Sequence, residues 1–122
     1  MYILSVEREF DAAHYLRGYQ GRCERLHGHR YRVMAHITAE KLDKTGMALD
    51  FTMLKKTLQE VLEKYDHLCL NEVAPFKKIN PSAENIAATV YKELRRRLPK
   101  GVMLESVDVW ESPEAYATFR PG

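Results

Sequence analysis

A two-residue alternation runs through His27-Gly28-His29-Arg30-Tyr31-Arg32-Val33-Met34-Ala35-His36-Ile37. Side chains at every second position of a β-strand share one face, so this run places two imidazoles at the start of a face that becomes apolar. Gly28 leaves room for a close approach between the two histidines. The pattern predicts a strand whose apolar face builds a core and whose first residues can bind a metal ion.

An earlier alternating run, from Tyr2 to His14, predicts a second strand that ends on a histidine. His14 can then face His27 and His29. Three neutral imidazoles hold zinc with one coordination position open, as in catalytic zinc sites. Cys23, in the loop between the strands, could be a fourth ligand that closes the site or a thiolate that moves protons beside an open metal. The residues alone leave both roles for Cys23 open.

From Asp50 onward the apolar period lengthens to that of a helix. Asp50 is a suitable N-cap for a helix that carries Phe51, Leu54, Leu58, Val61, Leu62 and Tyr65 on one face. A second helix follows Asn80-Pro81-Ser82 and is stopped by Pro99-Lys100-Gly101. Two strands finish the chain, one through Val107 and Val109 to Glu111 and one from Ala115 to Arg120.

The predicted order is strand, strand, helix, helix, strand, strand, which indicates an α+β fold with a four-stranded antiparallel sheet and two helices on one face. The 122 residues fit a single domain, 1–122. Such a sheet has two unpaired edges, and joining subunits edge to edge would cover them. We therefore expect a homo-oligomer.

Composition and charge exclude several classes of partner. A formal net charge of +2 is too small for a nucleic-acid-binding protein, and no apolar stretch reaches transmembrane length. We expect a cytoplasmic protein with no nucleic-acid or membrane partner. Basic residues gather around the histidine motif, where they form either a solvated strand edge or an electropositive mouth for an anionic substrate: Arg17, Arg22, Arg25, Arg30 and Arg32.

Two other places can carry chemistry. Asp66 and His67 follow the first predicted helix, where His67 either complements the helix dipole or is oriented by the aspartate for proton transfer. Glu111 lies on the same strand face as two valines, and a carboxylate on an apolar face is costly unless it is paired or binds a ligand. Glu111 is the stronger candidate.

Six ordered motifs together resemble the pyruvoyl-tetrahydropterin synthase family over nearly the whole chain. They are Phe10-Asp11-Ala12-Ala13-His14, Cys23-x3-His27-Gly28-His29, Leu49-Asp50-Phe51, Asp66-His67-Leu68-x-Leu70-Asn71, Pro81-Ser82-Ala83-Glu84-Asn85-Ile86-Ala87 and Val107-x-Val109-x-Glu111-Ser112. Within this family, the compact branch that forms 6-carboxy-tetrahydropterin for queuosine and deazapurine biosynthesis looks most similar.

The resemblance implies a role for each site residue. His14, His27 and His29 match the family's zinc ligands, and Cys23 matches its catalytic cysteine. Asp66 and His67 match the partners that complete a catalytic triad with that cysteine from a different subunit, and Glu111 matches the glutamate that anchors the pterin ring. The implied fold is the tunnelling fold, in which subunits join into a β-barrel, commonly as trimers stacked into hexamers.

The resemblance also implies a reaction. The substrate class is 7,8-dihydroneopterin triphosphate, converted to 6-carboxy-tetrahydropterin with release of acetaldehyde and triphosphate. Three alternatives remain open: the 6-pyruvoyl-forming reaction, a folate-pathway aldolase-like cleavage, and a non-catalytic zinc- or pterin-binding module. By charge alone, Arg17, Arg22 or Arg25 would contact the triphosphate.

Overall fold

The computed structural model describes residues 1–18 and 25–122. Two long strands, β1 (Tyr2–His14) and β2 (His27–Ala39), lead into helix α1 (Phe51–Leu62). A short strand β3 (Leu68–Cys69) and a 3-10 turn η2 (Leu70–Glu72) precede helix α2 (Ala83–Arg97). Strands β4 (Met103–Ser112) and β5 (Ala115–Phe119) complete the described order. The predicted sequence of two strands, two helices and two strands is therefore present, with one further strand.

The sheet has five strands in the order β3-β1-β2-β4-β5, and it is mixed rather than antiparallel. The prediction of a four-stranded antiparallel sheet was wrong in this respect, because β3 pairs in parallel with Ala12 and Ala13 of β1. Two residues are too few to show a hydrophobic alternation, so the sequence carried no signal for β3. The other three pairings, β1 with β2, β2 with β4 and β4 with β5, are antiparallel as expected.

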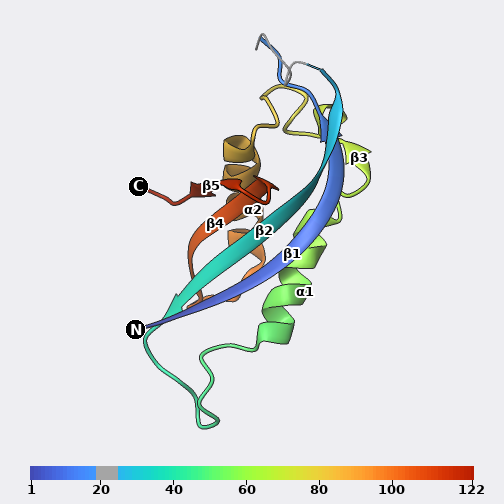
Figure 1. Ribbon diagram of the computed structural model, residues 1–122. Coiled ribbons are helices and arrows are strands. Elements are labelled where there is room, and N and C mark those ends of the chain that lie inside the picture. The colour runs from blue at the N-terminus through green and yellow to red at the C-terminus, as the bar shows by residue number, and fades with distance from the viewer. Residues whose placement is uncertain (19–24) are drawn as a thin grey trace.

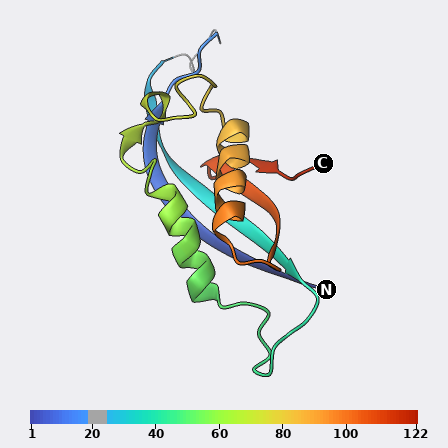
Figure 2. The same ribbon diagram turned by 180° about the vertical axis from the view of Figure 1, so that it is seen from behind.

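Both helices cover the same face of the sheet (Figures 1 and 2). Both helices begin where predicted: the Asp50 carboxylate, the predicted cap of α1, accepts the Thr52 amide proton, and the Ser82 hydroxyl accepts that of Asn85 at the start of α2. Each helix buries one apolar face, through residues such as Leu58 in α1 and Val90 in α2. The core lies between these faces and the inward side of β2 and β4, which carries Tyr31, Val33, Ala35, Ile37, Val107 and Val109.

The other face of the sheet is polar, and a chain of hydrogen bonds crosses it. The Ser5 hydroxyl is bonded to Nδ1 of His36 at 2.6 Å, and Nε2 of His36 donates to Asp108 at 2.7 Å. Thr118 donates to the other oxygen of Asp108 at 2.6 Å. One residue from each of β1, β2, β4 and β5 takes part, so the network links the four antiparallel strands. No helix in the described part of the protein is long and apolar enough to span a membrane.

Candidate metal centre and acid–base pair

The structure brings the three histidines together at one end of the β1–β2 pair. His14 is the last residue of β1 and lies opposite His27, while His29 lies opposite Ala12. Ring centroids are 4.6 Å apart for His14 and His27, 5.1 Å for His14 and His29, and 4.6 Å for His27 and His29. His14 is almost fully buried. The alternation of the two strands is what places all three rings on the helix-covered side.

Hydrogen bonds to backbone carbonyls fix the tautomers of two of these rings. Nδ1 of His14 lies 2.7 Å from the Pro81 carbonyl oxygen, and Nδ1 of His27 lies 2.6 Å from that of Arg25. A carbonyl oxygen only accepts, so each Nδ1 carries the proton and, in a neutral ring, each Nε2 presents a lone pair. The two Nε2 atoms are 3.0 Å apart. Two lone pairs at that separation repel unless a cation lies beside them, which is the arrangement of paired metal ligands.

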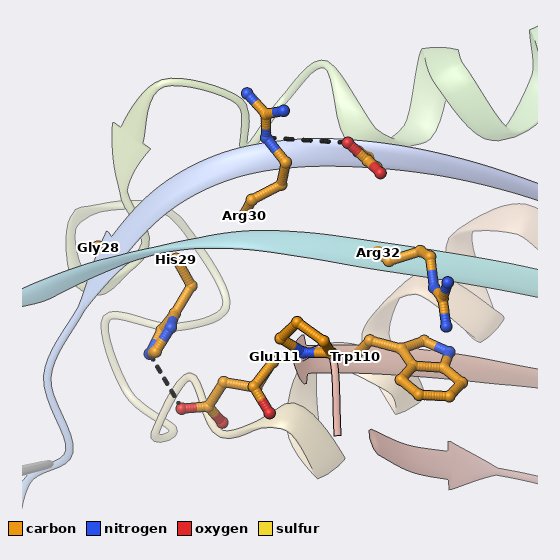
Figure 3. A pocket seen from close by; sticks show the side chains of 9 residues that line it. Gly28, His29, Arg30, Arg32, Trp110 and Glu111 are labelled. Atoms are coloured by element: carbon orange, nitrogen blue, oxygen red, sulfur yellow. Dashed lines mark ion pairs between the residues drawn. The ribbon is translucent and has the colours of Figure 1, made fainter. Parts of the chain in front are cut away.

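Glu111, near the end of β4, joins this cluster. Its Oε1 atom lies 3.1 Å from Nε2 of His29 (Figure 3). The same atom lies 3.6 Å from Nε2 of His14. His14 chiefly holds the pKa of the Glu111 carboxyl below its usual range, and burial lowers the pKa of His29. Among the residues that the structure describes, none is an aligned hydrogen-bond partner for the buried Nε2 of His29. The four ligand atoms lie within 4.8 Å of one another, and this donor set suits a divalent transition metal.

The ring of Tyr31 packs against the rings of His14 and His29. The sequence indicated Tyr31 only as a core residue, so this contact with the cluster was not predicted. The residue is fully buried, and its ring centroid lies 5.8 Å from that of His14 and 5.5 Å from that of His29. Burial, and then the Glu111 charge, raise the pKa of its hydroxyl. That hydroxyl has no hydrogen-bond partner among the described residues. Its position two residues after His29, on the same strand face, was the available signal.

Two asparagine side chains hold the segment that follows His14. Asn71 accepts the Tyr15 amide proton and donates to the Tyr15 carbonyl, both at 3.0 Å. Asn80 makes the same pair of bonds with the backbone of Arg17, both at 2.9 Å. Residues 15 and 17 are thus bonded along one edge as a neighbouring strand would bond them. The two amides continue the edge of β1 beyond β3 and so fix the backbone next to a predicted metal ligand.

The side chain of Arg17 has a structural task that argues against its predicted contact with a triphosphate. Its guanidinium donates to the Phe76 carbonyl at 2.9 Å and lies within 3.5 Å of the carbonyls of Asn71 and Ile79. Arg30 and Arg32 are likewise paired, Arg30 with Asp11 at 3.0 Å and Arg32 with Glu7 at 3.5 Å. Of the two alternatives for these basic residues, the ion pairs of Arg30 and Arg32 favour a solvated strand edge, whereas Arg17 keeps its charge while bonding to neutral carbonyls.

Asp66 and His67 are in contact and form a group separate from the histidine cluster, although His67 and His29 line the same cavity. One Asp66 oxygen accepts the Asp11 amide proton at 2.9 Å and is 3.0 Å from Nδ1 of His67. These bonds, chiefly the one from Asp11, hold the pKa of Asp66 below its usual range. His67 is 77% exposed and has a φ of 62°, a left-handed conformation that costs energy for a residue other than glycine. The pair is therefore oriented and open to an approaching group.

Two predicted site residues, Cys23 and Arg22, lie outside the described residues. Next to the cluster, a cavity of about 440 Å³ extends from His29 and Glu111 past Gly28 and Arg30 to Arg32 and Trp110 (Figure 3). The Arg32 guanidinium lies over the Trp110 ring, 4.0 Å from its centroid. The cavity has the size of a small-molecule site and opens directly onto the candidate metal ligands.

The chain matches the family model described as 6-pyruvoyl tetrahydropterin synthase over residues 3–122. It belongs to this family. A 6-carboxy-5,6,7,8-tetrahydropterin synthase of Synechocystis is 34% identical over 124 residues, which cover 98% of this chain and 93% of the relative. A dihydroneopterin monophosphate aldolase of Pyrococcus furiosus is 35% identical over 105 residues, covering 86% of this chain and 85% of the relative.

The fold agrees with the family assignment. The 6-pyruvoyl tetrahydropterin synthase of Caenorhabditis elegans superposes with a TM-score of 0.84 at 28% identity, and the match covers 100% of this chain and 98% of that protein. The predicted resemblance to the pyruvoyl-tetrahydropterin synthase family is thereby confirmed, and the histidine and glutamate cluster lies in a protein with that family's architecture.

Proposed function

We propose that this protein converts 7,8-dihydroneopterin triphosphate to 6-carboxy-tetrahydropterin with release of acetaldehyde and triphosphate, in a zinc-dependent reaction. The observation that carries the proposal is the convergence of three histidines, two of them with fixed tautomers, and one carboxylate beside a cavity of ligand size. The 34% identical relative named for the same product supports the choice of reaction.

His14, His27 and His29 would hold the metal. The donor set fits zinc because each imidazole can offer Nε2 as a ligand, while the Pro81 and Arg25 carbonyls keep the Nδ1 protons on His14 and His27. When bound, zinc supplies Lewis-acid chemistry that lowers the pKa of coordinated oxygen groups, such as the hydroxyls of the substrate's side chain.

Glu111 would anchor the pterin ring. The amino group and ring N–H of a pterin form a donor edge like that of a guanidinium, which a carboxylate meets with two parallel hydrogen bonds. The lowered pKa of Glu111 keeps the carboxylate ionised for that purpose. Because Glu111 also lies 3.1 Å from Nε2 of His29, anchoring would place the substrate's side chain beside the histidine cluster.

Cys23, Asp66 and His67 would move protons. Cys23 takes this role from the family resemblance alone, as the base that removes a proton from a carbon of the substrate's side chain. His67 would accept and return protons at its exposed ring while Asp66 orients it through Nδ1. By the family resemblance, this pair would lie at the metal site of a neighbouring subunit, where it would act together with that subunit's Cys23.

We infer a homo-oligomer, with trimers closing a β-barrel and stacking into hexamers, from the family resemblance and from the sheet edge. β1 pairs with β3 only at Ala12 and Ala13, so most of its outer edge has no partner among the described residues. Coexpression tests the shared site. The His29→Ala and His67→Ala variants should each be inactive, and random mixing should restore about a quarter of the wild-type activity per subunit. No recovery from mixed oligomers would contradict shared sites.

Product analysis tests the reaction and separates it from a second candidate. The relative named as a dihydroneopterin monophosphate aldolase makes cleavage of the substrate's side chain without tetrahydropterin formation the main competitor. After incubation of the zinc-loaded protein with 7,8-dihydroneopterin triphosphate, mass spectrometry should find 6-carboxy-tetrahydropterin. A 6-hydroxymethyl or 6-pyruvoyl product would assign the protein to another branch of its family. Binding of pterin without any product would indicate a non-catalytic module.

A further inference from the structure

Gly28 lies between two metal-ligand candidates in a regular strand pair. It faces Ala13 across the β1–β2 ladder, in a register that shows no irregularity from Tyr2 to His14. Its φ is not in the left-handed region, unlike those of Gly18, Gly46 and Gly101. Neither a turn nor a bulge therefore calls for glycine at this position, although glycine weakens a strand relative to alanine.

Packing within the protein does not call for glycine either. Among the residues that the structure describes, a Cβ at position 28 would come no closer than 3.9 Å to another atom, the carbonyl oxygen of Ala12. That distance is an ordinary van der Waals contact. Of the physical reasons for a glycine within a strand, one then remains: the close approach of something other than the described residues.

The space next to Gly28 is a cavity on both sides. The 440 Å³ cavity that contains Glu111 and a second one of about 510 Å³ that contains Asp11 and His67 share only Gly28 and His29 in their linings. Pairing between β2 and β4 begins at Arg32 and Trp110, so residues 28–31 of β2 have no ladder partner in β4 (Figure 3). A ligand that occupies the cavity beside Glu111 can extend along this open edge into the second cavity, because Gly28 and His29 line both.

We propose that Gly28 is a specificity-determining residue. Because it has no side chain, its backbone is free to contact the hydroxylated three-carbon side chain of a pterin. This inference rests on the proposed function and names the part of the ligand that position 28 recognises. A methyl group here would stand where the ligand's side chain passes, while the ring, held at Glu111, would keep its place. The bare ring and the ring with its side chain should therefore respond differently to substitution.

Gly28→Ala tests the proposal, with Gly101→Ala as the control. Gly101 lies between α2 and β4 with a φ of 89°, so alanine there is strained but lies away from the two cavities. The measurements are the dissociation constants of neopterin and of unsubstituted pterin by calorimetry, zinc content, Tm and oligomeric state. Gly28→Ala should weaken neopterin binding about tenfold or more, leave pterin binding, zinc content and oligomeric state unchanged, and give a Tm no lower than that of the wild type. Gly101→Ala should lower Tm and leave both affinities unchanged.

Each other outcome overturns the proposal in a distinguishable way. Equal neopterin affinity in wild type and Gly28→Ala would show that the ligand's side chain does not touch this position, while the proposed function would stand. Loss of zinc would assign Gly28 to the metal cluster, and a changed oligomeric state would assign it to contact with a second copy. Failure of the wild-type protein to bind either pterin would overturn the proposed function and this inference together.

Discussion

Replacing Asn71 by alanine should loosen the metal site by freeing the backbone that follows His14. The Asn71 side chain is 5% exposed and makes two hydrogen bonds of 3.0 Å to the backbone of Tyr15. Each bond contributes about 1 kcal/mol, and buried groups left without a partner add to the loss, so we expect the free energy of unfolding to fall by about 3 kcal/mol. For a protein of this length that corresponds to a fall in Tm of roughly 10–15 °C. Zinc affinity should fall as well, by roughly 10–100-fold, as for other groups that orient metal ligands.

Calorimetry of the metal-free protein gives the first quantity, and competition with a chromogenic chelator gives the second. Thr57→Val is the matched control, because Thr57 also donates to a backbone carbonyl, that of Met53, but within α1 and away from the cluster. The control should lower Tm slightly and leave zinc affinity unchanged. A large fall in Tm for Asn71→Ala with wild-type zinc affinity would refute the claim that Asn71 positions His14.

Three further variants or treatments have defined outcomes. Glu111→Gln should retain zinc and bind pterin about tenfold or more weakly, because a charge-assisted bond is lost; loss of zinc in calorimetric titration would instead make Glu111 a ligand. The pKa of Asp66 is lowered from 3.8, so its carboxylate stabilises the fold at neutral pH, and this stabilisation is lost as pH falls through the folded-state pKa. In urea titrations, Asp66→Asn should therefore flatten the pH dependence of stability below about pH 4. A pH dependence identical to that of the wild type would contradict this. Removal of zinc by a chelator should lower Tm, and adding zinc at about 100 times its Kd should restore about 2.7 kcal/mol of stability. The same response is expected in the control variant His36→Gln, which lies outside the cluster. A Tm that does not change with zinc would contradict the metal site.

The sequence predicted the parts of the fold whose periods extend over many residues. The alternation in β1 and β2 is long enough to set both the strands and the side of the sheet on which His14, His27 and His29 lie. The caps Asp50 and Ser82 fixed where the helices begin. Strand β3 was missed because its two residues owe their conformation to a non-local pairing with β1.

The candidate site was predictable only where residue type alone indicates chemistry. Histidines and Glu111 stand out by type, whereas Asn71 and Asn80 look like ordinary loop residues until their bonds to residues 15 and 17 are seen. The contacts of Arg17 were missed for a related reason, since its charge suggested an anion and its carbonyl partners lie far away in sequence. Contacts between residues far apart in sequence leave no local pattern. The sequence therefore predicted the candidate metal ligands but not Asn71 and Asn80, which hold the backbone beside them.

The most direct test of the proposed function is the amount of acetaldehyde released per triphosphate in a single incubation with 7,8-dihydroneopterin triphosphate. We predict equal amounts of the two products, with both released only when zinc is bound and neither released after chelation. Triphosphate release without acetaldehyde, or acetaldehyde release that persists in the metal-free protein, would contradict the account.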